Sequence, residues 1–148
     1  MSSANLSTVA EGSPAFTVSA DPARLDVAWI VHSILGSYWG GRLAGAQVRA
    51  ALQGSLCFGA YADGKQIGLV RVLTDGAIVS TVTDVFVQEE WRGKGVGTAL
   101  MTAAMAHPSV AGTLCILRAR AEAAMWYYKN FDFQMLDPVH GIMQRNPK

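Results

Sequence analysis

A chain of 148 residues with a formal net charge of +1 at pH 7 is long enough to bury a core without disulfides and most simply forms one domain. The balanced charge argues against a nucleic-acid binder or a membrane-surface protein, because either would carry a basic face. No apolar stretch is long enough to span a bilayer, and the first residues lack the pattern of a secretory signal. We therefore expect a cytoplasmic protein with a flexible tail over residues 1–13 and a single domain over 14–148.

The N-terminal third predicts a strand and two helices. Residues 16–18 favour a short strand, and Asp21 followed by Pro22 is a typical helix start. Apolar residues at helical spacing extend this helix to Tyr38, and residues 42–53 favour a second helix that ends near Gly54.

The middle of the chain predicts an antiparallel meander. Three β-rich runs, near 56–62, 66–74 and 77–87, are joined by the pairs Asp63-Gly64 and Asp75-Gly76. An Asp-Gly pair between such runs is a strong hairpin signal.

The last third predicts a helix from Val96 that stops at His107-Pro108, followed by a strand over 113–119 and a short helix over 122–129. A final strand pair is expected over 132–136 and 139–145. The whole pattern favours an α+β fold with a single mixed, mostly antiparallel central sheet flanked by helices.

Three glycines, Gly93, Gly95 and Gly97, alternate where a strand gives way to a helix. The free amides and the dipole of a helix N-terminus favour a phosphate or pyrophosphate, and glycine leaves those amides open. Arg92 and Lys94 flank the turn and could bind the same oxygens. The Walker pattern fails because Gly95 follows Lys94, and the dinucleotide pattern fails because residue 98 is a threonine and the turn follows a meander. A tight turn without a ligand is the alternative.

These residues resemble a known family. Arg92, Gly95 and Gly97 match the Gln/Arg-x-x-Gly-x-Gly/Ala motif of the GNAT superfamily of acyl-CoA-dependent N-acyltransferases, and MWYYKNFDF resembles that family's LYEKLGF box. The resemblance in element order covers residues 16–145. It implies that coenzyme A is the ligand and acetyl-CoA the cosubstrate. By the resemblance, the pyrophosphate would be held by the backbone amides of Gly93, Lys94, Gly95, Val96, Gly97 and Thr98. The pantetheine arm would pair with the strand backbone of Val85, Phe86 and Val87.

Two positions depart from the family pattern. Asp132 replaces the usual glycine of the Gly-Phe pair, and Ala121 stands where many members carry an asparagine that contacts the cofactor. Both bear on the C-terminal half of the site. They keep open a non-catalytic acyl-CoA-binding sensor or regulatory module, and a different phosphate ligand such as a nucleotide is a third reading.

Acyl transfer to an amine requires a base for the amine and an acid for the leaving thiolate. By the resemblance, Tyr128 is the acid; a phenol is protonated at neutral pH and can donate to a thiolate. Asp84 is the candidate base, because strand alternation places it on one face with Ile78, Val82 and Phe86, where a carboxylate is desolvated. The alternative for Asp84 is a structural carboxylate that holds a loop amide, and both tyrosine neighbours, Tyr127 and Tyr128, could instead be core aromatics. By the resemblance, a backbone amide near Val85 or Phe86 polarises the carbonyl.

Acceptor recognition is expected near the end of the first helix, where His32, Tyr38 and Trp39 precede a Gly-Gly pair. A structural His32 and packing roles for the two aromatic residues are the alternatives. Cys57 and Cys115 lie in apolar segments without the paired spacing of a metal site, so we expect buried free thiols, no metal and no covalent acyl-enzyme.

The sequence therefore predicts an N-acetyltransferase that moves acetyl from acetyl-CoA to a primary amine by direct attack. The acceptor would be a small molecule or a peptide, and the resemblance makes a homodimer possible.

Overall fold

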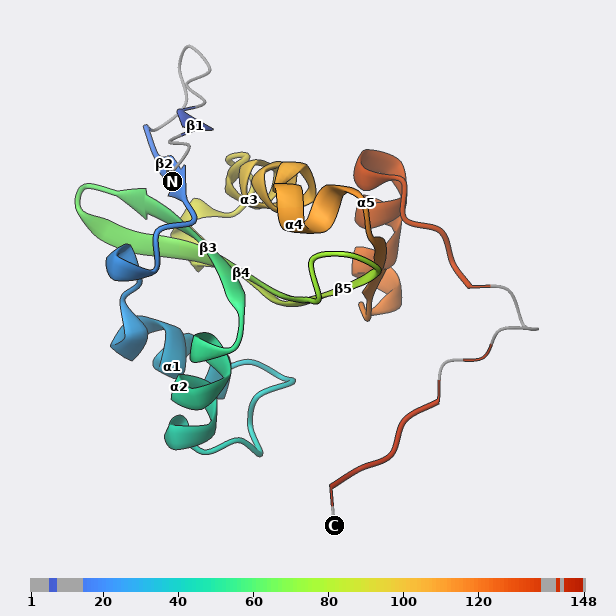
Figure 1. Cartoon of the computed structure of the whole chain (residues 1–148). Coiled ribbons are helices and arrows are strands. Elements are labelled where there is room, and N and C mark those ends of the chain that lie inside the picture. The colour runs from blue at the N-terminus through green and yellow to red at the C-terminus, as the bar shows by residue number, and fades with distance from the viewer. Residues whose placement is uncertain (1–5, 8–14, 137–140, 142, 148) are drawn as a thin grey trace. The chain divides into compact units, whose positions relative to one another are not determined.

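The computed structural model describes residues 6–7, 15–136, 141 and 143–147 (Figure 1). Two one-turn 3-10 helices accompany the regular elements, at Pro22–Arg24 (η1) and Glu89–Trp91 (η2). The strands are β1 (Leu6–Ser7), β2 (Thr17–Ser19), β3 (Leu56–Ala62), β4 (Lys65–Thr74), β5 (Val79–Val87) and β6 (Leu114–Leu117). The α-helices are α1 (Val27–Leu35), α2 (Gly45–Gln53), α3 (Val96–Ala106), α4 (Pro108–Ala111) and α5 (Ala121–Phe131).

The strands of the described chain form one sheet in the order β1-β2-β3-β4-β5-β6. Every neighbouring pair is antiparallel except β5 and β6, which run parallel. Both predicted hairpins form: Asp63 and Gly64 take positive φ between β3 and β4, and the Asp75 carboxylate accepts three amides of the turn between β4 and β5. The predicted mixed, mostly antiparallel sheet is confirmed.

Helices cover both faces of this sheet (Figure 1). On one face, α1 and α2 contribute to a buried cluster with the sheet, made of Ile30, Ile34, Val48, Leu52, Cys57 and Leu69. On the other face, α3 lies on β4. A Cβ atom at Gly68 would come within 2.8 Å of Leu100 and 3.2 Å of Val96. The missing side chain at Gly68 thus sets how closely the helix approaches the strand.

The first helix begins later than predicted and ends sooner. Asp21 and Pro22 start only η1, and α1 begins at Val27 with Asp26 as its N-cap. The buried Gln66 side chain of β4 accepts the Asp26 amide at 2.8 Å, so a contact from a distant strand fixes the start. The helix ends at Leu35, which leaves Tyr38 in the following loop.

The chain divides into two compact units, residues 1–118 and 119–148. The second unit contains α5. None of its described residues after Phe131 forms a strand, so the strand predicted over 132–136 is wrong. The strand predicted over 139–145 does not form at its described residues, and residues 139, 140 and 142 lie outside them. Asp132 ends α5 with φ +58°, a left-handed conformation that glycine adopts most easily and aspartate tolerates. This explains how aspartate can replace the glycine that the family pattern expects.

Most of the predicted tail lies outside the described residues, although Leu6–Ser7 pair with β2. The single domain predicted over 14–148 stays a prediction. Within the described part of the chain, no helix combines the length and apolar character needed to cross a bilayer.

Candidate functional site

The glycine turn leads into α3 with its backbone open on one side. Gly93 and Gly95 have φ of +72° and +85°, values that are strained for residues with a side chain. A Cβ atom at either glycine would have no heavy atom within 4 Å. These glycines therefore serve backbone conformation and access rather than close packing within the protein.

The first turn of α3 presents free amides. The helical hydrogen bonds begin with Ala99 N–H donating to the Gly95 carbonyl at 3.0 Å, so the amides of residues 96–98 precede them. The N-cap is Gly95, which has no side chain to accept from these amides. Val96 is buried and holds the turn on the sheet, whereas Thr98 is exposed. The arrangement suits an anion bound at the helix N-terminus.

The two cations of the turn lie against neighbouring groups. Arg92 donates from Nε to the Val87 carbonyl at 3.0 Å, and its guanidinium lies 5.9 Å from the centre of the Phe86 ring. Lys94 Nζ lies 5.5 Å from the Trp91 ring. Arg92 thus connects the turn to the end of β5, a structural role that the sequence did not predict.

Among the described residues, β6 leaves one flank of the preceding strand, β5, uncovered beyond Val82. Parallel pairing joins β5 to β6 only from Val79 to Val82, and β5 continues to Val87 without β6 beside it. An extended ligand with amide groups could therefore pair with the backbone of residues 83–87. This stretch leads through the one-turn helix η2 into the glycine turn.

A β-bulge interrupts β5 where that flank begins. Leu69 pairs with Phe86 and Arg71 pairs with Thr83, so Val70 alone lies opposite two residues, Asp84 and Val85. Asp84 has φ +50°, which is unusual for a residue other than glycine.

The bulge corrects the predicted alternation of β5. Val82 pairs with Val72, and Phe86 pairs with Leu69, so Val82 and Phe86 lie on opposite faces of the sheet because 69 and 72 differ by an odd number. Asp84 contacts Arg71 on the Leu69 face. Ile78 lies outside β5 and is 73% exposed. Asp84 therefore shares a face with Phe86, as predicted, but not with Val82 or Ile78.

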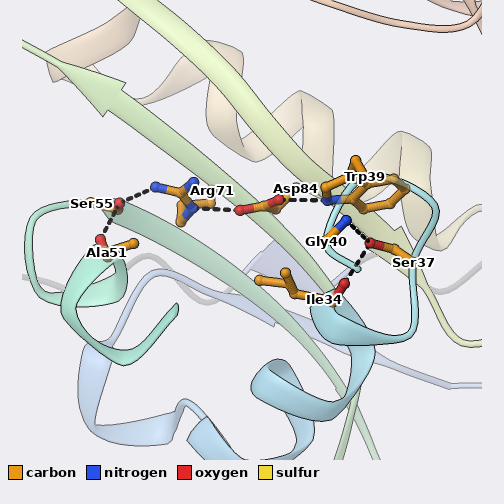
Figure 2. Close-up of polar contacts among 8 residues, drawn as sticks. All are labelled: Ile34, Ser37, Trp39, Gly40, Ala51, Ser55, Arg71 and Asp84. Carbon is orange, nitrogen blue, oxygen red and sulfur yellow. Dashed lines mark hydrogen bonds and ion pairs between the residues drawn. The ribbon is translucent and has the colours of Figure 1, made fainter. Parts of the chain in front are cut away.

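The Asp84 carboxylate is buried, and each of its oxygens accepts a hydrogen bond (Figure 2). Arg71 Nε donates to Oδ2 at 2.6 Å, and Trp39 Nε1 donates to Oδ1 at 2.7 Å. Arg71 also donates from its guanidinium to Ser55 Oγ at 2.9 Å. These contacts favour the alternative of a structural carboxylate, with an indole N–H in place of a loop amide. Asp84 as a base stays a prediction.

Sequence reasoning did not single out Arg71 or Ser55. The signal was present in the stretch IGLVRVL, residues 67–73, where one arginine interrupts a run of apolar residues. A charged residue in such a run needs a partner, and Asp84 is the carboxylate that supplies it.

The predicted acceptor residues are only partly brought together. Tyr38 and Trp39 lie in the loop between α1 and α2, with ring centres 4.8 Å apart and exposures of 62% and 38%. His32 is exposed on α1. Among the described residues, its side chain makes no hydrogen bond, ion pair or ring contact with Trp39 or Asp84. Trp39 reaches the bulge through its hydrogen bond to Asp84.

Tyr127 and Tyr128 both belong to α5, in the second unit. The Tyr127 ring contacts Trp126 and Phe133, with centres 4.8 and 6.0 Å apart. Tyr127 is 8% exposed and Tyr128 is 55% exposed. The role of Tyr128 as an acid stays a prediction.

Both cysteines are free thiols, as predicted; Cys57 is buried as predicted, whereas Cys115 is only half-buried. Burial raises the pKa of Cys57 to about 11, although the Arg71 charge opposes the shift and Asp84 adds to it. The Cys57 thiol is thus protonated at neutral pH and a poor nucleophile.

Residues 53–135 match the family model of the acetyltransferase (GNAT) domain. This range contains the glycine turn, α3, α5 and the strands β5 and β6. The chain belongs to the GNAT acetyltransferase family. This match covers all the predicted cofactor residues. The predicted acceptor residues, His32, Tyr38 and Trp39, lie before it.

Individual relatives agree with this assignment. A GNAT-family protein from Xanthomonas campestris pv. campestris, provisionally named an acetyltransferase, has a solved structure with a TM-score of 0.84 and 35% identity. The match covers 92% of this chain and 96% of that one. A second structure, from meticillin-resistant Staphylococcus aureus, shares the fold with a TM-score of 0.70 at 23% identity, over 89% of this chain and 99% of that one. The predicted GNAT fold is confirmed.

A Gibberella zeae protein with the provisional name of an acetyltransferase is 33% identical over 103 residues. This match covers 55% of the chain and 58% of the relative, so the chain spans less than two thirds of that relative's length. GNAT acetyltransferases generally use acetyl-CoA as cosubstrate, which agrees with the open glycine turn described above.

Proposed function

We propose that this GNAT protein transfers the acetyl group of acetyl-CoA to a primary amine by direct attack. The observation that carries the proposal is the glycine turn at the start of α3, which follows η2 and the strand β5, whose last residues extend beyond their pairing with β6. A diphosphate at the helix N-terminus and an amide-containing arm along residues 85–87 would lie in one continuous path. That path matches the chemistry of coenzyme A.

The amides of residues 93–98 bind the pyrophosphate in this proposal, because they combine free donors with the positive end of the α3 dipole. Arg92 and Lys94 add positive charge at the turn. The arm pairs with the backbone of Val85, Phe86 and Val87, and an amide near Val85 or Phe86 polarises the thioester carbonyl.

In the reaction, the neutral amine nitrogen attacks the acetyl carbon and the carbon–sulfur bond breaks. Tyr128 donates its phenolic proton to the departing thiolate, and the amine loses one proton to base or solvent. The buried, protonated Cys57 supports direct attack over an acyl-enzyme, because a thiol whose pKa is raised to about 11 is a poor nucleophile at neutral pH.

The first experiment measures thiol release from acetyl-CoA over a panel of small amines and peptides, together with calorimetry of CoA, ATP and NAD. We expect CoA to bind in preference to the two nucleotides and at least one amine to release thiol. Tight CoA binding without turnover on any amine would support the sensor module instead. Preference for ATP or NAD would contradict a CoA site.

The second experiment tests the acid. Tyr128→Phe should lower kcat roughly 10- to 1,000-fold, because it removes the proton donor and keeps the ring. Its affinity for CoA should be nearly unchanged. Tyr127→Phe is the matched control on the same helix and should keep most of the activity. Full turnover in Tyr128→Phe would remove this residue from the mechanism.

A further inference from the structure

The loop between α1 and α2, residues 36–44, is held at the bulge of β5 by one carboxylate. Asp84 accepts the Trp39 indole N–H at 2.7 Å with one oxygen and Arg71 Nε at 2.6 Å with the other. Asp84 and Arg71 are both largely buried, with side chains 7% and 15% exposed. Removal of either partner leaves the other buried without its counter-charge, which makes this contact costly to break.

The loop itself is built tightly onto the end of α1. Ser37 Oγ donates to the Ile34 carbonyl at 2.6 Å and accepts the Gly40 amide at 3.2 Å. A Cβ atom at Gly40 would lie only 1.9 Å from the Ile34 carbonyl oxygen. The backbone on either side of Trp39 therefore has little conformational freedom while the Ser37 hydrogen bonds are formed. Through its bond to Asp84, the Trp39 indole fixes the loop relative to β5.

The Arg71 side chain extends the same connection to α2. Its guanidinium donates to Ser55 Oγ, which in turn donates to the Ala51 carbonyl at 2.6 Å near the end of α2 (Figure 2). The row Ala51–Ser55–Arg71–Asp84–Trp39 thus runs from α2 across β4 and β5 to the loop. It ends at the exposed ring pair of Tyr38 and Trp39.

From this geometry we infer that Asp84 is a positioning residue, which holds Trp39 and with it the loop 36–44 as a wall of the acceptor site beside the bulge. The acceptor part of this inference rests on the proposed acetyl transfer. The tether itself does not, because it is a property of the folded chain. Asp84 acts through Trp39, and the ring pair of Tyr38 and Trp39 contacts the acceptor.

The test compares Trp39→Phe, Asp84→Asn and the double variant. Trp39→Phe keeps an aromatic ring and removes only the indole donor. Because Trp39 is 38% exposed, this variant should fold even if Asp84→Asn does not. Asp63→Asn is the matched control. It makes the same change at a residue with the same φ, +50°, in the hairpin turn between β3 and β4.

Three measurements separate the tether from the proposed activity. Hydrogen exchange of residues 36–44 reports the loop without any substrate. Steady-state kinetics with an amine found in the panel gives the KM of the acceptor, kcat and the pH profile of kcat. Calorimetry gives the affinity for CoA.

We expect exchange in the loop to be about tenfold faster or more in Trp39→Phe, which removes the indole donor, and also faster in Asp84→Asn, whose neutral amide has one acceptor oxygen for the two donors Trp39 and Arg71. The double variant should exchange no faster than the faster single variant, since one contact is broken in each case. The KM of the acceptor should rise by a similar factor. The CoA affinity and the shape of the pH profile should stay as in the unmodified protein, and Asp63→Asn should match that protein throughout.

Two results would overturn the inference. One is loop exchange that is unchanged in Trp39→Phe. The other is a loss of kcat with an altered pH profile in Asp84→Asn while Trp39→Phe behaves normally, which would identify Asp84 as the base. If the unmodified protein releases no thiol with any amine, the proposed function fails, and the exchange data still decide whether Asp84 holds the loop.

Discussion

At the scale of single residues, positive φ marks two different uses of glycine. Gly76, φ +72°, lies in the hairpin turn between β4 and β5, whereas Gly95, φ +85°, caps α3. A Cβ atom would meet no heavy atom within 4 Å at either position. The two sites therefore impose a similar backbone cost on any other residue, and they differ in whether a ligand is expected there.

This difference gives a matched pair of variants. Gly95→Ala and Gly76→Ala should each lose about 1–2 kcal/mol of unfolding free energy, the cost of a left-handed residue with a Cβ, measured by urea denaturation. Only Gly95→Ala should weaken CoA binding, by about tenfold or more, because the methyl group disturbs hydrogen bonds to a charged ligand. Equal CoA affinities in the two variants would contradict the placement of the pyrophosphate at this turn.

Single residues also show where sequence reasoning was limited. The glycine turn, both Asp-Gly hairpins and the free thiols were predicted because short local patterns determine them. The partners of Asp84 were not, because Trp39 and Arg71 lie 45 and 13 residues away from it in sequence. Only the fold brings such groups together.

At the scale of elements, the errors arose where a neighbouring element decides the outcome. Gln66 of β4 binds the amide of Asp26 and so helps to fix the start of α1. The bulge at Asp84 depends on the register with β4, which alternation within one strand does not reveal. The order and type of the elements in residues 15–131 were otherwise largely correct, because hydrophobic spacing and turn residues specify them.

The approach of α3 to β4 controls the position of the candidate diphosphate site. Gly68→Val should push against Val96 and Leu100 of α3, since a Cβ at Gly68 already lies within 3.2 and 2.8 Å of them. We expect a loss of about 1–3 kcal/mol in unfolding free energy, as is usual for an overpacked core, together with weaker CoA binding in calorimetry. Gly112→Val is the control, because a Cβ there has no heavy atom within 4 Å. A destabilised Gly68→Val with full CoA affinity would mean that the first turn of α3 does not move.

At the scale of the whole molecule, two buried titratable groups should make the free energy of unfolding fall as pH rises in the alkaline range. Burial raises the pKa of Cys57 from 9.0 to about 11 and the pKa of Tyr61 from 10.0 to about 12. The Tyr61 hydroxyl is buried without a hydrogen-bond partner among the described residues, and a charged form would be costly there. Both side chains are therefore neutral in the folded protein.

The sign of the Cys57 effect follows from linkage. Its folded pKa exceeds the unfolded one, so its contribution is fully present below pH 9 and is lost as pH rises toward 11. At about 1.4 kcal/mol per pKa unit, the loss amounts to about 2–3 kcal/mol. In urea denaturation between pH 8 and 11, Cys57→Ala should therefore lose stability with pH less steeply than the unmodified protein. Cys115→Ala is the comparison: burial also raises the pKa of this half-buried thiol, so this variant should flatten the slope less than Cys57→Ala. Identical slopes for the unmodified protein and Cys57→Ala would contradict the prediction.

The parting of β5 from β6 has a consequence for how the empty protein behaves in concentrated solution. Residues 85–87 read Val-Phe-Val and offer main-chain donors and acceptors along a flank that β6 does not cover. Such a flank can recruit a stray strand from another molecule and so start aggregation. In the proposed complex, the pantetheine arm would pair with this edge of β5 and cover its free main-chain groups. The cosubstrate would therefore also protect the enzyme against self-association.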